Sequence, residues 1–311
     1  MTVFLSLLSK ILPLYFLIGM GFVSRRYLEV EARSLARTTI YLVAPVVIFH
    51  SGFNAEVQGS VLILPLLFCL VGYMTSAIFY FFISPLVFKD SRRNLLSCAV
   101  GNSNTGYFGL PVVLALLGQE AFTLAVLVSL GSILFENTLG VFLLARGQFS
   151  AKQSLLKLFK LPALYAFSFG LLLNVLGLTT ENLIYTDTVA LFKGAYVILG
   201  MMIIGSGIAS VEKGAFDVKL IGLALIGKLM LFPALMVCLL ILDSHFGPFL
   251  SQEGRQILWI LSLCPVAANT VAYATEFKLY PEKAARLVFL STLVALVFIP
   301  LAYPLFERFG R

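Results

Sequence analysis

The sequence GNSNTGYFGLP, from Gly101 to Pro111, is polar and rich in glycine, yet it lies inside a charge-free run, residues 94–119. A charge-free run of this length is typical of a membrane span, because a helix needs about 20 apolar residues to cross the hydrocarbon core. Proline removes a backbone donor, and glycine tolerates non-helical dihedral angles. The stretch therefore predicts a membrane helix that is broken in its middle.

The composition of the whole chain favours a bilayer environment. Of the 311 residues, 60% are hydrophobic and 12% are charged, whereas a soluble domain carries about 25% charged residues. The apolar runs are continuous rather than alternating, which favours helices over barrel strands. We therefore predict an all-α membrane protein. The N-terminal run lacks a preceding basic region, so we expect a first span rather than a signal peptide.

Ten apolar runs are candidate spans, and we number them in chain order. Their predicted ranges are 3–23, 33–52, 61–83, 93–117, 121–144, 155–177, 188–209, 217–241, 255–277 and 284–305.

The basic residues alternate between the loops of this ten-span arrangement. The loops after the odd-numbered spans hold 16 of the 22 Lys and Arg residues, and the other loops hold only Arg255. Because basic loops stay in the cytoplasm, we expect a multi-pass protein of the cell (inner) membrane with both termini extracytoplasmic. This placement accounts for the net charge of +7 and argues against a nucleic-acid partner.

The two halves of the chain carry similar sequence features. Span 1 contains LPLYFLIGMG and span 6 LPALYAFSFG, while span 4 contains NTG and span 9 NTV. A duplicated unit of five spans inserts its second copy upside down. We therefore predict two inverted repeats, 1–150 and 151–311, with a break in spans 4 and 9.

Transporters built from inverted repeats place the substrate at the bilayer midplane, where their broken helices meet. The free amides of a half-helix N-terminus favour an anion. The predicted site has three groups of residues. The predicted substrate-binding residues are Asn102, Asn104, Thr105, Gly106, Asn269, Thr270 and Lys228; the helix-breaking residues are Gly109, Pro111 and Pro265; and the candidates for ion coupling are Glu136, Asn137 and Ser103.

Several motifs together resemble the auxin efflux carrier family. They are NTGYFGLP (Asn104 to Pro111), PVAANTVAYATEFKLYP (Pro265 to Pro281) and KLMLFPALMV (Lys228 to Val237). The long cytoplasmic loop of the plant carriers is missing, so bacterial-type members are closer.

The resemblance covers the whole chain and implies a two-domain carrier. It implies a scaffold and a mobile transport domain, each built from both repeats, in a fold shared with bile-acid/sodium symporters and sodium/proton antiporters. It also implies a small organic anion as substrate, either a dicarboxylate or an aromatic carboxylate. No cofactor and no resident metal are expected. A coupling ion, H⁺ or Na⁺, is expected near the crossover. Whether the protein forms a homodimer is left open.

Two charged residues lie in the middle of predicted spans, where a charge costs roughly 2.5–3.5 kcal/mol on insertion scales. Lys228 matches a basic position of the family, and it could attract a carboxylate or compensate the carbonyls of broken helices. Glu136 could bind a coupling ion. Alternatively, the two residues pair with each other or with polar groups of the bundle and have a structural role. Lys193 and His50 are expected near span ends.

Other function classes fit less well. GSGIAS (Gly205 to Ser210) loosely resembles an intramembrane serine protease, but it lacks a histidine at the same depth, so no enzyme is predicted. No phosphate-binding loop that would indicate ATP use is present. A sodium-coupled bile-acid-type symporter is the nearest alternative, and a sensor or channel is more distant.

Overall fold

The computed structural model describes residues 2–54, 59–145, 162–178, 183–209, 216–247 and 249–306. These residues form helices and no named strand. The α-helices are α1 (Thr2–Tyr27), α2 (Ala32–Thr38), α3 (Ala44–Phe53), α4 (Gly59–Leu62), α5 (Leu64–Ile78), α6 (Ser84–Val87), α7 (Arg92–Gly101), α8 (Leu110–Leu117), α9 (Gln119–Phe135), α10 (Val141–Ala145), α12 (Pro162–Val175), α13 (Leu183–Ala209), α14 (Val218–Ile226), α15 (Phe232–His245), α16 (Gln252–Ser262), α17 (Asn269–Glu276) and α18 (Pro281–Ala302).

Several spans are made of α-helices joined by a π-helical turn. These turns are Thr39–Val43, Phe79–Ile83, Thr105–Gly109, Glu136–Gly140 and Gly227–Leu231. A π-turn adds a residue to the helix and changes which side chains face inward, and such turns are frequent at functional sites. The two predicted intramembrane charges lie in two different turns of this kind: Glu136 begins the turn Glu136–Gly140, and Lys228 lies in the turn Gly227–Leu231.

All ten predicted ranges contain helix in the described residues. Within that part of the chain, five helices are long and apolar enough to cross a membrane. They are Leu64–Val87, Gln119–Leu144, Leu183–Ala209, Val218–His245 and Pro281–Leu305.

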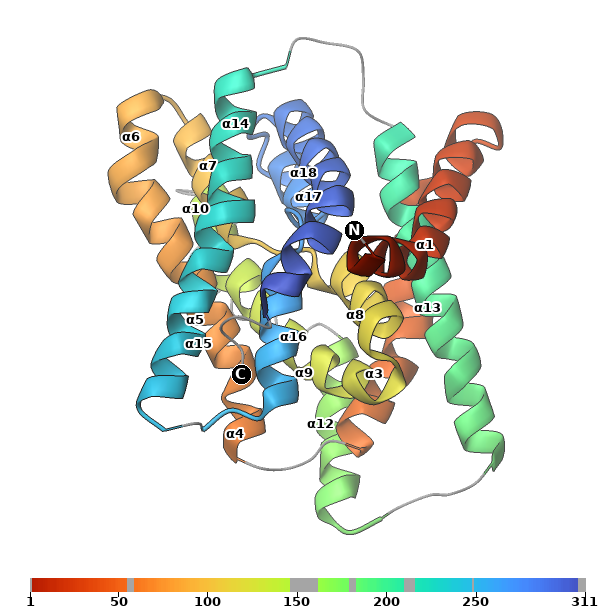
Figure 1. The fold of residues 1–311 in the computed structure, drawn as a ribbon. Helices are drawn as coiled ribbons and strands as arrows, with labels where there is room; N and C mark the ends of the chain where they lie inside the picture. Colours follow the sequence, from red (N-terminus) through yellow and green to blue (C-terminus); the bar gives the residue numbers. More distant parts are fainter. Residues whose placement is uncertain are drawn as a thin grey trace.

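Four helices pack in two close pairs. Helix α1 packs along α13, and the two stand side by side at the right of Figure 1, while α3 packs along α12. Glycines allow this approach: a Cβ on Gly205 would lie 1.9 Å from the carbonyl oxygen of Ile18, and one on Gly170 would lie 2.2 Å from that of Phe49. We call α1, α2, α3, α12 and α13 the outer group, and the remaining helices the crossed bundle.

The crossed bundle contains the two interrupted helices. Residues 102–104 separate α7 from the π-helical turn Thr105–Gly109 that leads into α8, and residues 263–268 separate α16 from α17. An isolated antiparallel bridge joins Ser103 of the first break to Val266 of the second. The two predicted breaks are therefore in contact at the centre of the fold.

An ion cluster joins three basic loops at one end of the bundle, the upper end in Figure 1. Asp217 precedes α14 and contacts Arg92 at 3.0 Å and Lys283 at 2.6 Å, while Asp90 contacts Arg92 at 2.8 Å. Although burial opposes ionisation of Asp217, hydrogen bonds from Lys283 and Arg92 lower its pKa to about 2. The cluster thus ties together the first turns of α7, α14 and α18.

Candidate functional site

The two interrupted helices are held together through their own backbones. The amide of Asn104 donates to the carbonyl of Pro265 at 2.9 Å, and the amide of Ala267 donates to that of Asn102 at 3.1 Å. Each break therefore satisfies polar groups that the other leaves open, which broken backbone in a membrane requires.

Small residues and proline permit this crossing. A Cβ on Gly101 would lie 2.5 Å from the ring of Phe135, and one on Gly109 would lie 2.6 Å from Leu261. Pro111 is the second residue of α8, directly after the π-helical turn Thr105–Gly109, and has no N–H to donate within that helix. Gly109 thus serves close packing, while the chain departs from helical geometry earlier, at residues 102–104.

Two asparagine side chains of the first break have polar atoms without a hydrogen-bond partner. Asn102 and Asn104 are 1% and 4% exposed, and Asn102 Oδ1 and Asn104 Nδ2 have no partner. The other amide atom of Asn102, Nδ2, donates to Thr270 Oγ1 at 3.2 Å. A buried polar atom without a partner costs roughly 1–3 kcal/mol, so both atoms indicate a place for a ligand or an ion.

The half-helix that follows Asn104 begins with open amides. Residues 105–117 form one continuous helix, and the first amides of a helix have no acceptor within it. A side chain at Gly106 would meet only the hydroxyl of Tyr196, at 3.3 Å. In this half-helix the amide of Thr105 donates to the carbonyl of Ser103 at 2.8 Å and that of Gly109 to the carbonyl of Asn104 at 3.0 Å, so the open amides are those of residues 106–108. In the second half-helix the amides of Thr270 and Val271 donate to carbonyls of the break. The first half-helix is therefore the better anion site.

Lys228 approaches the crossover from within the bundle. It is fully buried, its Nζ donates to Ser103 Oγ, and the ammonium lies 3.6 Å from the ring centroid of Phe232. Ser103 follows the C-terminal end of α7, where a cation compensates the helix dipole. Ser132 adds a hydrogen bond to the carbonyl of Ser103 at 2.7 Å.

Glu136 belongs to a different cluster, around the second break. Its Oε1 accepts from Asn269 Nδ2 at 3.0 Å, and Asn102 and Tyr273 also hydrogen-bond its carboxylate. Lys228 and Glu136 do not pair with each other among the ion pairs of the described residues. Asn269 is exposed rather than buried, so it bonds Glu136 at the edge of the crossover.

The remaining predicted positions are less informative. The side chain of Asn137 lies outside the described residues. No group of three or more His, Cys, Asp or Glu in the described part could hold a metal ion.

One residue was placed wrongly by the sequence. Helix α13 begins at Leu183, earlier than predicted, so Lys193 lies well inside the helix, and its side chain is 7% exposed. His50 is half-buried, and its Nδ1 hydrogen-bonds the hydroxyl of Tyr185 at 3.0 Å. His50 lies in the last turn of α3, near the span end as expected, whereas the expectation for Lys193 failed because span ends cannot be read accurately from apolar content.

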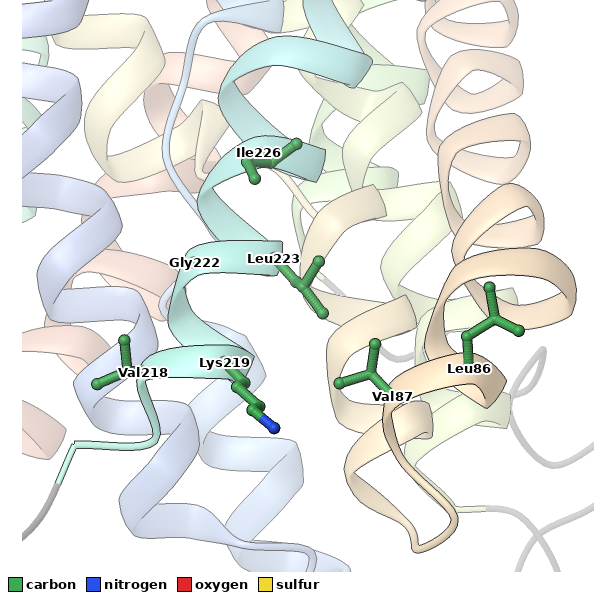
Figure 2. Close-up of a pocket in the computed structure, with 7 residues that line it drawn as sticks. All are labelled: Leu86, Val87, Val218, Lys219, Gly222, Leu223 and Ile226. Carbon is green, nitrogen blue, oxygen red and sulfur yellow. The ribbon is translucent and has the colours of Figure 1, made fainter.

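One groove lies away from the crossover. Figure 2 shows it between α6 and α14, with Lys219 among otherwise apolar side chains such as Leu86 and Ile226. Its volume is about 520 Å³. None of the residues at the helix breaks line it, so it is separate from the site described above.

Comparison with known proteins relates the chain to membrane transporters. The model of a family described as "Membrane transport protein" matches residues 6–303. A relative from Methanothermobacter thermautotrophicus, described as an uncharacterized transporter, is 24% identical over 302 residues, which cover 96% of this chain and 95% of that protein. Since the family model spans nearly the whole chain, the protein belongs to this family of membrane transporters, the auxin efflux carrier family that its motifs resemble.

Proposed function

We propose that the protein carries small organic anions across the cell membrane by alternating access, and that the anion binds at the crossover of α7–α8 and α16–α17. The observation that carries this proposal is the buried amide donor of Asn104, without a partner, beside the open amides of the following half-helix. Donors that converge on one point, next to a positive helix end, favour a carboxylate. A dicarboxylate and an aromatic carboxylate both supply one.

The helix contacts support an arrangement of two inverted repeats. If spans 1–5 are equivalent to spans 6–10, the contact of α1 with α13 (spans 1 and 7) corresponds to that of α12 with α3 (spans 6 and 2). Both pairs rely on glycines: Gly21 and Gly205 in the first, Gly52 and Gly170 in the second. The bridge between Ser103 and Val266 joins equivalent breaks. In this arrangement each repeat contributes helices to both the outer group and the crossed bundle.

This arrangement assigns a part to each group of helices. The outer group acts as the scaffold and the crossed bundle as the moving domain. The ion cluster around Asp217 keeps the ends of α7, α14 and α18 together, so the bundle moves as one body. With the basic loops in the cytoplasm, the termini are extracytoplasmic; a homodimer remains a prediction.

The cluster around Glu136 supports ion coupling. A buried carboxylate that accepts hydrogen bonds from Asn269, Asn102 and Tyr273 is able to take up H⁺, or to join neighbouring oxygens around Na⁺. Its position beside the crossover would link the ion to the anion through the shared residue Asn102. A sodium-coupled symporter of the bile-acid type is therefore the second candidate, and uptake with and without sodium distinguishes the two.

The function is tested in proteoliposomes with an anion chosen by thermal-shift screening of malonate, malate and indole acetate. We expect Asn104→Ala and Asn269→Ala to lose most of the uptake, while the protein still folds in detergent. Asn174→Ala is the matched control, because that amide already donates to the carbonyl of Phe53 in the outer group. Uptake at the wild-type rate in both crossover variants would refute the assignment.

A further inference from the structure

Lys193 is a buried cation on the outer group that has no carboxylate partner in the described part of the chain. It lies in α13, its side chain is 7% exposed, and its Nζ lies 5.5 Å from the ring centroid of Phe122 in α9. Within the described residues, no ion pair includes it. A cation–π contact only partly replaces the hydration that a buried ammonium loses. An anion is therefore the partner that this position lacks.

The face of α13 that carries Lys193 points at the crossover. Positions 193, 196 and 200 follow helical spacing and share one face. On that face Tyr196 approaches Gly106, and a Cβ on Gly200 would lie 3.4 Å from the carbonyl oxygen of Tyr107. Three residues of helix span about 5 Å along its axis, so Lys193 lies one turn from Tyr196, on the side of it away from Gly200.

On the other side, the described neighbours of Lys193 are polar but not acidic. His50 is near enough for its charge to interact with that of Lys193, and its Nδ1 is engaged by Tyr185. His50 is close to the end of α3 and Lys193 is in the first half of α13. Both therefore lie toward the end of the molecule opposite the basic loops.

We propose that Lys193 is a second anion-binding group, which holds a carboxylate of the transported solute on the scaffold side between the crossover and the extracytoplasmic surface. This inference rests on the proposed anion transport. Lys228 is held by Ser103 inside the bundle, whereas Lys193 belongs to the outer group. In a carrier whose bundle moves, the anion contacts Lys193 in only one of the two access states.

The first experiment measures binding of malonate, malate and indole acetate to the purified protein by calorimetry. We expect Lys193→Gln to weaken binding at least about tenfold, as loss of a buried charge partner does, and Lys193→Arg to restore most of it. Wild-type affinity in Lys193→Gln with lost binding in Asn104→Ala would overturn this inference and leave the proposed function standing. Wild-type affinity in both variants would overturn both.

The second experiment needs no known substrate. Lys193→Cys is made in a Cys238→Ser background, because Cys238 is exposed and Cys69, Cys98 and Cys264 are buried. We expect an anionic, membrane-impermeant methanethiosulfonate to modify position 193 in proteoliposomes and to spare a control cysteine at Leu191, which is 75% exposed on the surface of α13. An unmodified Cys at 193, or equal modification of both positions, would overturn the proposal.

Discussion

Asp217→Asn removes one negative charge from the cluster that joins α7, α14 and α18. The carboxylate contacts Arg92 at 3.0 Å and Lys283 at 2.6 Å, and it also caps α14 by accepting from the amide of Leu220 at 3.2 Å. Asparagine is as good an N-cap residue as aspartate. The substitution therefore keeps the cap and tests the charge alone.

The expected loss follows from the pKa of Asp217, which the cluster lowers from 3.8 to about 2. One pKa unit corresponds to about 1.4 kcal/mol, so the charge contributes about 2 kcal/mol to the free energy of unfolding at neutral pH. The Asp217 side chain is 12% exposed, but Arg92 and Lys283 are 30% and 31% exposed, so solvent screens the interaction in part and about 2 kcal/mol is an upper value. Asp90→Asn is the control: that side chain is 44% exposed, and such surface pairs contribute about 0–1 kcal/mol.

The assay is equilibrium unfolding in detergent at several pH values. Because the folded pKa of Asp217 lies below its unfolded value, the stabilisation is present above about pH 4 and is lost as the pH falls toward 2. The difference between wild type and Asp217→Asn should therefore be largest at pH 7 and shrink below pH 4. A difference that stays constant from pH 7 to pH 3, or equals that of Asp90→Asn, would refute the reasoning.

Three further predictions concern packing, the buried lysine and coupling. Gly205→Ala should destabilise the protein by about 1–3 kcal/mol through overpacking against the Ile18 backbone, whereas Gly207→Ala, with open space around it, should not; equal stability in thermal unfolding would contradict this. Lys228→Gln should weaken binding of an anion more than that of its neutral ester, and equal losses by calorimetry would indicate a purely structural role. Glu136→Gln should remove the dependence of uptake on pH or sodium, and a retained ion dependence in proteoliposomes would exclude Glu136 as the coupling group.

Much of the site could be predicted because its residues interrupt a simple pattern. Asn104 and Pro111 stand out in a run that should otherwise be apolar helix, and Asn269 does so in the other half. The structure brings these breaks together. Lys193 could not be recognised in this way, because its importance depends on which face of α13 meets the bundle, and the predicted start of that helix was several residues late.

The sequence also could not predict which residue pairs with each of the two buried charges. Lys228 and Glu136 look like a pair in the chain, since each is a single charge in an apolar span. In the fold, however, Lys228 bonds Ser103 and Glu136 bonds Asn269. A hydrogen bond requires its donor and acceptor atoms to lie about 3 Å apart. The spacing of residues along the chain does not predict distances of that size between side chains on different helices.

The sequence by itself determined that this is a helical membrane protein and where two of its helices break, because solvation by lipid acts on each segment separately: an apolar run forms a helix, and a polar, glycine-rich interruption ends it. Tertiary structure alone decided which break contacts which, which amide atoms of Asn102 and Asn104 stay without a partner, and that Lys193 is buried beside Phe122 of α9. Those features depend on how helices from distant parts of the chain pack against one another, and only close contact between them fixes the distances on which hydrogen bonds and charge interactions depend.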